Sequence, residues 1–249
     1  MVRLSHERKK LSSSTRLAFF ISSKSVKKQG KKYIMYFLVI QSTYDVVRVG
    51  FFNDFQISPD QKVIQKFHVA RDLVRSIQEL LQAHNLTFTD LAFIGVSRGP
   101  APFNALRSVL ATINGLAFAT KIPLIGVDAI KALHTSSDAP QTVVFLNAFN
   151  NEVYYAYTKR AQLTIGVANI HEILPVILLD IPHGEITFLG NGTALFTESI
   201  MATFGTHANI PTPIISEVPL ETLAHICVNK FNKNEMRGQV EPLYLKRAV

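Results

Sequence analysis

The segment best suited to binding chemistry is Gly190-Asn191-Gly192, which follows the apolar run Ile186–Leu189 and opens a stretch of helical spacing. Glycines at a strand-to-helix turn let backbone N–H groups approach a phosphate, and the helix dipole favours the anion. The same residues suit an ordinary turn, because glycine adopts backbone angles that other residues avoid. On the residues alone, both a phosphate-binding loop and a structural turn remain open.

Motifs of the common catalytic classes are absent from the sequence. The eight histidines include no H-E-x-x-H and no pair four residues apart, so a zinc protease is not expected. There is no Walker phosphate loop and no G-x-S-x-G nucleophile elbow. Cys227 lies in an amphipathic segment, Leu220–Lys233, where a thiol is far more often packed in the core than used as a nucleophile.

The elements that must position any site are centred on Leu91–His134. Leu91–Ser97 is a short apolar run typical of a strand buried on both faces, and Arg98-Gly99-Pro100 ends it. Apolar residues recur at helical spacing over Phe103–Thr120, and Pro123–Val127 predicts a second buried strand. A strand, a crossover helix and a parallel strand form a βαβ unit, which places a parallel sheet at the core.

Several short motifs stand in a specific order: R-G-P at residues 98–100, F-x-x-L-R from Phe103, G-L-A from Gly115, I-P-L-I-G-V from Ile122, and further stretches at Asn147–Tyr157 and Glu241–Lys246. Together they resemble the TsaB (YeaZ) family. Those proteins are non-catalytic members of the actin-like, sugar-kinase-like (ASKHA) superfamily and serve in making threonylcarbamoyladenosine in tRNA. The resemblance covers about residues 35–249. It implies an α/β, actin-like (ribonuclease H-like) two-lobe fold with a shortened second lobe.

The resemblance also identifies where nucleotide chemistry would occur. Active members of the superfamily carry an acidic residue in the first strand to hold the metal–nucleotide, but here the matching positions in the two lobes are Gln41 and Asn147. Phe149 stands where the family usually has arginine. A neutral amide cannot act as an anionic metal ligand. We therefore expect no cofactor and no strong magnesium–ATP binding, and Gly190, Asn191 and Gly192 become a vestigial nucleotide loop.

A metal site is also not expected. The catalytic partner in the same pathway, TsaD, carries N-H-x-E-G-H directly after a strand like P-L-I-G-V, and two imidazoles at that spacing can share a metal. In this sequence the segment is D-A-I-K-A-L, so Ala129 and Leu133 stand at the histidine positions and Lys131 at the glutamate position. The resemblance thus implies that the metal ligands are missing.

A docking surface is implied by the resemblance, because this family binds its partner through the two helices of the first lobe. The second helix, Phe103–Thr120, is apolar nearly all round, although a crossover helix needs one apolar face. Apolar surface left after packing marks a partner interface. The alternative for the polar residues of the first helix is an ordinary solvent-exposed face. The residues expected at the interface are His68, Ala70, Arg71, Val74, Ile77, Asn104, Arg107 and Ala111.

The chain divides into a basic tail and a nearly neutral body. Residues 1–34 hold 10 of the 26 Lys/Arg and one of the 18 Asp/Glu. We expect this tail to be a disordered extension or to precede a true start at Met35; a transit peptide or a nucleic-acid arm is the alternative. A single cysteine favours the reducing cytoplasm. The apolar run at residues 17–22 is too short to span a bilayer.

The body is expected to form two lobes, residues 35–136 with the order βββαβαβα and residues 137–249 as a reduced repeat. The segments that support this division are strands Tyr36–Ser42, Asp45–Phe52 and Phe55–Lys66, helix Phe67–His84, a second hairpin of Thr142–Ala148 and Glu152–Lys159, strand Ile186–Leu189, and helices near Ala194–Phe204 and Leu220–Lys233. Because fold alone does not fix function, the function must be argued from particular residues.

Three functions from different classes were weighed. The first is a non-catalytic subunit that docks to a TsaD-like catalytic enzyme, acts with a TsaE-like ATPase and reaches tRNA only through the complex; the family also allows a homodimer through the same helices. The second is a stand-alone kinase or metal-dependent (glycoprotease-like) hydrolase, which Gln41, Asn147, Ala129 and Leu133 oppose. The third is an RNA-binding module acting through the basic tail, whose binding would depend steeply on salt.

Overall fold

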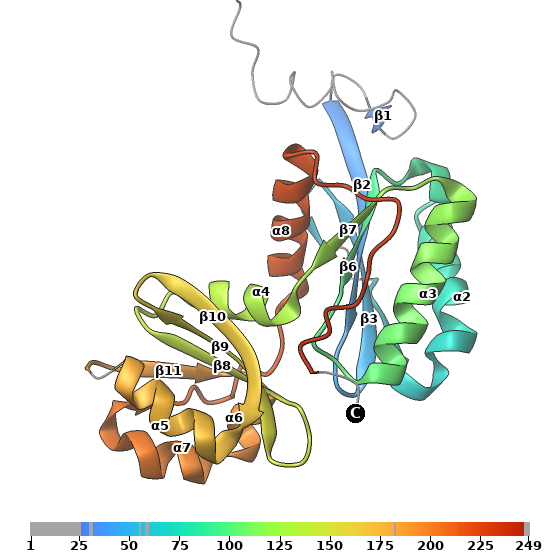
Figure 1. Ribbon diagram of the computed structural model, residues 1–249. Helices are drawn as coiled ribbons and strands as arrows, with labels where there is room; N and C mark the ends of the chain where they lie inside the picture. Colours follow the sequence, from blue (N-terminus) through green and yellow to red (C-terminus); the bar gives the residue numbers. More distant parts are fainter. Residues whose placement is uncertain (1–25, 30–31, 55, 58–59, 182, 247–249) are drawn as a thin grey trace, which may run out of the picture.

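The computed structural model describes residues 26–29, 32–54, 56–57, 60–181 and 183–246, which form two lobes, each built on its own β-sheet (Figure 1). Most of the basic tail lies outside the described residues, so the expectation that it is disordered stays a prediction. Its last part, β1 (Val26–Gln29), pairs antiparallel with the start of β2 (Lys32–Ser42), which begins before Met35.

The first sheet has seven strands, with β1 beside β2 and a main order of β4-β3-β2-β6-β7, while β5 also pairs with β3. The strands after β2 are β3 (Val46–Asn53), β4 (Gln56–Ile57), β5 (Lys62–Gln65), β6 (Phe93–Ser97) and β7 (Leu124–Val127). β3 runs antiparallel to β2, whereas β6 and β7 run parallel to it. All five residues of β6 are buried, which explains why its sequence is a continuous apolar run.

The second sheet repeats this arrangement with five strands in the order β10-β9-β8-β11-β12. Its strands are β8 (Thr142–Asn147), β9 (Glu152–Lys159), β10 (Gln162–Asn169), β11 (Ile186–Leu189) and β12 (Ala208–Asn209). The hairpin β8–β9 is antiparallel, and β11 follows β8 in parallel, as β6 follows β2 in the first sheet. The repeat of strand order and direction defines two related lobes.

Two long helices cover one face of the first sheet. α2 (Val69–Ala83) follows a single 3-10 turn, η1 (Lys66–His68), and α3 (Phe103–Thr120) has the bounds expected from the sequence. The helices pack side by side in Figure 1. A short 3-10 turn, η2 (Phe88–Asp90), leads into β6. Leucine, isoleucine and valine side chains of both helices and of the sheet form a continuous buried cluster, and burial of such side chains is the main stabilising term.

The opposite face of the first sheet is covered by α8 (Leu220–Asn232), which contacts β2, β6 and β7 (Figure 1). The expected division placed this helix in the second lobe, because it follows that lobe in the sequence. In the fold it returns to the first lobe, where Gly95 leaves space for the Cys227 thiol. Burial raises the pKa of Cys227 to about 12, so the thiol is packed and not nucleophilic.

The C-terminal segment also returns to the first lobe. Arg237 exchanges two backbone hydrogen bonds with Leu124 of β7, each 2.8 Å long. The Asn114 side chain donates to and accepts from the Val240 backbone at 3.0 and 2.9 Å. The edge of β7 is thereby covered by the chain itself.

The lobes are joined by α4 (Ala129–Thr135), which contacts β8 and β9 of the second sheet. A single apolar cluster runs through this junction and includes residues of both sheets and of α8, such as Phe37, Phe93, Leu146 and Leu189. On the far face of the second sheet lie α5 (Ile170–Asp180), α6 (Asn191–Leu195), α7 (Thr197–Phe204) and the turn η3 (Gly205–His207). No helix among the described residues is long and apolar enough to cross a membrane.

Candidate functional sites: the cleft between the lobes and the helix pair α2–α3

A small cleft of about 160 Å³ lies between the lobes, beside the ends of β2 and β8. Its walls come from the turn after β2, from α4, from the start of α6 and from the segment before α8: Gln41, Ser42, Thr43, Tyr44, Asp45, Pro100, Ala129, Leu133, Leu146, Asn191, Ser216, Glu217 and Val218. The cleft contains Gln41, the position at which active members of the superfamily are expected to hold a metal–nucleotide.

Gln41 is almost completely buried at the end of β2. Its amide nitrogen donates to the Val218 carbonyl at 2.9 Å, and its Oε1 has no hydrogen-bond partner among the described residues. The hydroxyl of the neighbouring Ser42 is also buried and also has no hydrogen-bond partner among the described residues. The position that carries an acidic residue in active members is therefore a neutral side chain fixed by a bond to the segment that leads to α8.

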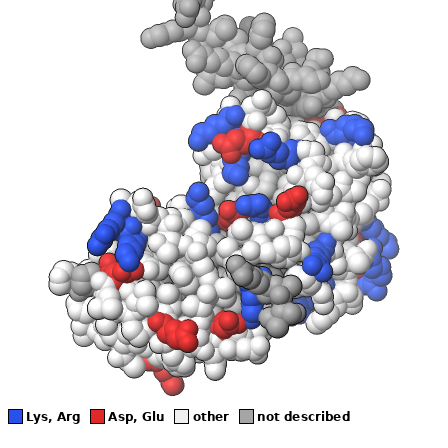
Figure 2. Space-filling view, viewed as in Figure 1, with Lys and Arg blue, Asp and Glu red and all other residues white. Residues whose placement is uncertain are grey.

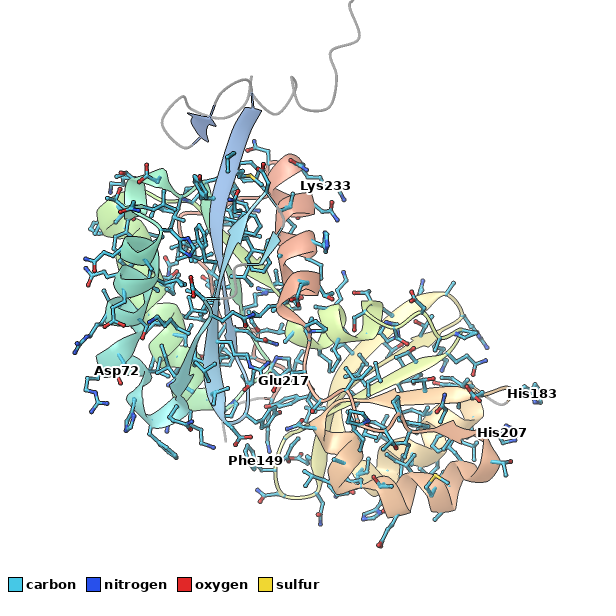
Figure 3. The ribbon with its side chains drawn as sticks, turned by 180° about the vertical axis from the view of Figure 1, so that it is seen from behind. Asp72, Phe149, His183, His207, Glu217 and Lys233 are labelled. Atoms are coloured by element: carbon cyan, nitrogen blue, oxygen red, sulfur yellow. The ribbon has the colours of Figure 1, made fainter. Side chains whose placement is uncertain are left out.

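Glu217 and Asp45 are the carboxyl groups that line the cleft, and sequence analysis did not identify Glu217. Figure 3 shows Glu217 and Phe149 where the two lobes meet. Burial raises the pKa of Glu217, while Arg48 at 3.2 Å opposes that rise and Asp45 adds to it. Glu217 lies in a loop without a recognisable motif, so nothing in the sequence singled it out. Its ion pair with Arg48 already uses one carboxylate oxygen.

The turns that follow β2 and β8 contact each other. The Tyr44 hydroxyl donates to the Asn147 carbonyl, and the Tyr44 ring lies 6.4 Å from the Phe149 ring, measured between centroids. Burial raises the pKa of Tyr44 well above its usual range, which keeps the hydroxyl a donor. Tyr44 lines the cleft, so these contacts join its wall to the β8–β9 turn of the second lobe.

The loop Gly190–Gly192 packs tightly against β8. Asn191 accepts a hydrogen bond from the Asn147 backbone at 3.1 Å. A Cβ on Gly190 would lie 2.1 Å from the Phe145 carbonyl oxygen, and the positive φ of 97° at Gly190 is open almost only to glycine. These contacts give the structural reason for the glycine at Gly190. That the loop is a vestigial nucleotide site stays a prediction.

Replacing Gly190 with alanine is expected to lower the free energy of unfolding by about 3 kcal/mol or more. Both the unfavourable backbone angle and the clash of the new Cβ with Phe145 destabilise the folded chain. Gly205→Ala is the matched control. Gly205 also has a positive φ, but a Cβ there would meet nothing within 4 Å, so its cost of roughly 1–3 kcal/mol is that of the backbone alone. Urea unfolding of both variants measures the difference, and equal losses would contradict the packing described here.

Two of the three positions at which TsaD carries His or Glu, Ala129 and Leu133, also lie at this cleft. Ala129 and Leu133 are buried in its wall on α4, and Lys131 is exposed on the outer side of that helix. Across the part of the chain that the structure describes, no three His, Cys, Asp or Glu side chains gather closely enough to hold a metal ion. Asp128, just before α4, is ion-paired with Arg98.

The expected interface residues, which lie on η1, α2 and α3, differ in how far they are exposed. His68, Ala70, Arg71, Asn104, Arg107 and Ala111 are exposed, and Val74 is half-buried. Ile77 was expected at the interface, but it is completely buried in the core of the first lobe. That expectation was wrong for Ile77, because its position on α2 turns it toward the sheet together with Leu73 and Leu80.

The outer stripe of α3 carries small and apolar residues and one charge. Asn104, Arg107, Ala111, Gly115 and Phe118 recur three or four residues apart and are all exposed. The Phe118 side chain is 77 % exposed, and on η1 the Phe67 side chain is 86 % exposed. Phe67 and Gly115 were not among the expected interface residues, although their helical spacing could have identified them. An exposed apolar stripe of this kind marks a protein–protein contact.

Arg107 also has a role within the chain. Its guanidinium lies 3.6 Å from the centroid of the Phe103 ring, and its Nε donates to the Tyr244 hydroxyl at 3.0 Å. Phe103, Phe149 and Tyr244 line a wider groove of about 600 Å³ between the start of α3, the β8–β9 turn and the C-terminal segment. Arg107 therefore stabilises the C-terminal segment beside the outer stripe.

Gly115 is a glycine that folding does not require. It lies inside α3, and a Cβ there would meet nothing within 4 Å. Gly115→Ala is expected to raise the free energy of unfolding by about 0.5–1 kcal/mol, because glycine loses more conformational freedom in a helix than alanine. Thermal or urea unfolding of the isolated chain measures this gain. A loss of stability would show that close packing within the chain selects the glycine.

Taken together, two lobes with the same strand order, a cleft between them and a helix pair on the first define an actin-like α/β protein. Solved structures support this class. The structure entitled "YeaZ from Pseudomonas aeruginosa" matches with a TM-score of 0.64 over 85 % of this chain and 100 % of that one, at 18 % identity. A second, of an uncharacterized protein with similarity to peptidase YEAZ from the same organism, matches with a TM-score of 0.66 at 19 % identity.

The chain belongs to the family whose model is described as TsaD: tRNA N6-adenosine threonylcarbamoyltransferase, which matches residues 62–246. Among curated relatives it is similar to the tRNA threonylcarbamoyladenosine biosynthesis protein TsaB of Escherichia coli, 24 % identical over 64 % of this chain and 72 % of the relative. TsaB of Haemophilus influenzae is 23 % identical over 76 % of this chain and 84 % of the relative. The predicted resemblance to TsaB is confirmed.

A shorter but stronger likeness links the chain to catalytic members. The tRNA N6-adenosine threonylcarbamoyltransferase of Clostridium botulinum is 45 % identical over 62 residues, which is 25 % of this chain and 18 % of that enzyme. The chain therefore shares a segment with an enzyme of the family while it resembles TsaB over most of its length.

Proposed function

We propose that this protein is a non-catalytic subunit required for forming threonylcarbamoyladenosine in tRNA, and that it docks to a TsaD-like catalytic enzyme. One observation carries the proposal. The cleft between the lobes carries the neutral amide of Gln41 where an acidic residue would hold a nucleotide, while the outer stripe of α3 presents small and apolar residues to solvent. Similarity to the TsaB proteins of two bacteria supports the same role.

The cleft is poorly suited to catalysis. Gln41 and Asn147 supply neutral amides where a magnesium–nucleotide complex needs anionic oxygen. Glu217 is nearby, but it is paired with Arg48. These features disfavour a kinase, and Ala129 and Leu133 disfavour a metal-dependent hydrolase.

The docking surface we propose is the outer side of α2 and α3, with Ala111 in the middle of α3 and Ala70 at the start of α2. Small residues permit close approach of two helices from a partner, and Phe67 and Phe118 supply apolar area that folding leaves exposed. A TsaE-like ATPase would join this complex, and tRNA would be reached through the catalytic subunit. We place the protein with its tRNA substrate in the cytoplasm.

Co-purification tests the proposal. The tagged chain, expressed in its native host, should retain a TsaD-like protein through gel filtration, and mass spectrometry should identify that protein in near-equal amount. A variant with charge on the outer stripe serves as the negative control. Recovery of the chain without any TsaD-like protein, under conditions in which the chain remains folded, would contradict the proposed function.

A further inference from the structure

Three adjoining grooves form one channel on the side of the first lobe that carries α8. One of about 300 Å³ lies between α4 and α8, one of about 560 Å³ lies beside β7, and one of about 380 Å³ lies between the end of α3 and the C-terminal segment. The first two share Asp128, Lys230 and Glu235, and the last two share Arg237. We call this continuous surface the basic groove.

The basic groove concentrates positive charge on a body that is close to neutral. Residues 35–249 hold 16 Lys/Arg and 17 Asp/Glu, but six cations and three carboxylates line the groove, an excess of three positive charges. The cations are Arg98, Lys121, Lys131, Lys230, Lys233 and Arg237, and the carboxylates are Asp128, Glu235 and Glu241. Figure 2 shows basic residues gathered over the end of α8 and the C-terminal segment, with acidic ones between them. A concave surface with one predominant charge attracts ligands of the opposite charge.

Two of the three carboxylates are already paired within the groove. Asp128 is ion-paired with Arg98. Glu235 lies 3.9 Å from the Lys230 ammonium, which also donates to the Gly126 carbonyl at 3.0 Å. These contacts fix the wall of the groove and partly neutralise Arg98 and Lys230.

The other four cations are available to a ligand. They are all exposed, and none of them pairs with a carboxylate among the residues that the structure describes: Lys121, Lys131, Lys233 and Arg237. Lys121 lies over the Phe118 ring, 4.5 Å from its centroid. Internal ion pairs therefore leave most of the positive charge of the groove unused.

Helix stability explains only part of this arrangement. Lys230 lies in the last turn of α8 and Lys233 is its C-cap, where a cation interacts favourably with the helix dipole. Lys121 is the C-cap of α3, with a φ of 61° that glycine or asparagine usually supplies. Lys131 lies in the first turn of α4, where the dipole disfavours a cation, and Arg237 lies outside the helices. The excess charge thus exceeds what the fold requires.

We propose that the basic groove binds the phosphate backbone of tRNA. Contacts from Lys and Arg to phosphates supply much of the affinity of proteins for nucleic acids, and a positively charged groove can follow the backbone. An anionic membrane presents a flat surface, which would not reach the half-buried Arg98 and Lys230. The choice of RNA rests on the proposed function: the catalytic subunit would hold the adenosine that is modified, and the groove would hold the backbone elsewhere on the same tRNA.

The basic groove and the proposed docking surface lie on opposite sides of the first sheet. α8 covers one face of that sheet, and α2 and α3 cover the other (Figure 1). The groove reaches the docking surface only at Phe118, which lines its far end. A TsaD-like partner and RNA could therefore bind the chain at the same time.

Fluorescence anisotropy with an unmodified tRNA transcript and the full chain, over a range of salt concentrations, tests the proposal. The double variant Lys233→Gln with Arg237→Gln should reduce the slope of log K against log salt by about 1.4–1.8, since each lost phosphate contact contributes roughly 0.7–0.9. Affinity should fall by about tenfold or more at about 100 mM salt. The basic tail is the same in all variants, so a difference in slope belongs to the groove.

Lys62→Gln with Arg75→Gln is the matched control. It removes two positive charges near α2, where both side chains pair with Glu79, on the other side of the sheet. Its affinity should stay within about twofold, because distant exposed charges are screened by salt. Glu241→Gln removes the carboxylate of the groove that has no ion pair among the described residues and should tighten binding by roughly two- to tenfold. Loss of structure cannot produce such a gain.

Melting temperatures and capture of the TsaD-like partner, measured for every variant, should match those of the unchanged chain. These measurements separate the groove from the proposed function, because the salt slopes decide the groove even when no partner is captured. Equal slopes in the two double variants, or no gain from Glu241→Gln, would overturn the proposal. Competition by poly-glutamate or by phosphatidylglycerol vesicles as strong as that by unlabelled tRNA would also overturn it.

Discussion

Replacing Ala111 with glutamate is expected to abolish binding to a TsaD-like partner while the chain itself stays folded. Ala111 is exposed at the middle of the outer stripe of α3, so the isolated chain tolerates a charge there. In the proposed complex the glutamate would lose water without gaining a counter-ion, which costs several kcal/mol. We expect affinity to fall by at least about 100-fold, measured by titration calorimetry, with circular dichroism and melting temperature unchanged.

Two further variants make this result specific. Ala70→Arg places the opposite charge on α2 and should have the same effect, because Ala70 is also exposed. Arg75→Ala is the control at the rim. Arg75 pairs with Glu79 one helical turn away, at 3.0 Å, and exposed pairs of this kind contribute ~0–1 kcal/mol. Full binding by both charged variants would place the docking surface elsewhere on the chain.

The second large effect concerns activity of the chain alone. Purified without partners, it should neither hydrolyse ATP nor modify tRNA supplied with threonine, bicarbonate and ATP, with rates below about 1 % of the reconstituted system. The reasons are the neutral amides at Gln41 and Asn147 and the apolar residues at Ala129 and Leu133, where a catalytic relative has metal ligands. The change Gln41→Asp should not create activity, because the cleft remains small and the buried carboxylate would gain no metal.

A robust rate that survives repurification and disappears on mutating Gln41 or Glu217 would contradict this prediction. Activity that disappears on repurification would instead identify a contaminating enzyme. Heat inactivation at the melting temperature of the chain separates the two results, since activity intrinsic to the chain must be lost with its fold.

The sequence predicted the fold where the pattern was strong. Helix Phe103–Thr120 was expected with the bounds that α3 has, because eighteen residues of helical spacing lie between a proline and a second buried strand. β10 was missed although Leu163, Ile165 and Val167 alternate with polar or small residues, because the turn at Arg160 and Ala161 contains no glycine or asparagine to mark a hairpin. The return of α8 to the first sheet is a long-range contact, which no local pattern records.

The candidate sites were predictable to a different extent. The amide at Gln41 and the apolar residues at Ala129 and Leu133 followed from comparing single positions, and the structure places these three residues together in the wall of the cleft. The role of Glu217 could not be predicted, because it depends on packing between segments far apart in the chain. On α2 the sequence did not separate Ile77, which faces the core, from Ala70, which faces solvent, since helical spacing alone does not say which stripe covers the sheet.

The account is tested most directly by measuring threonylcarbamoyladenosine formed on tRNA by a reconstituted system with and without this chain. The catalytic TsaD-like enzyme and the ATPase should be nearly inactive alone, should become active when the chain is added, and should stay inactive with Ala111→Glu. Full activity of the enzyme without the chain, or full rescue by the Ala111→Glu variant, would contradict the proposal of a required subunit that docks through α2 and α3.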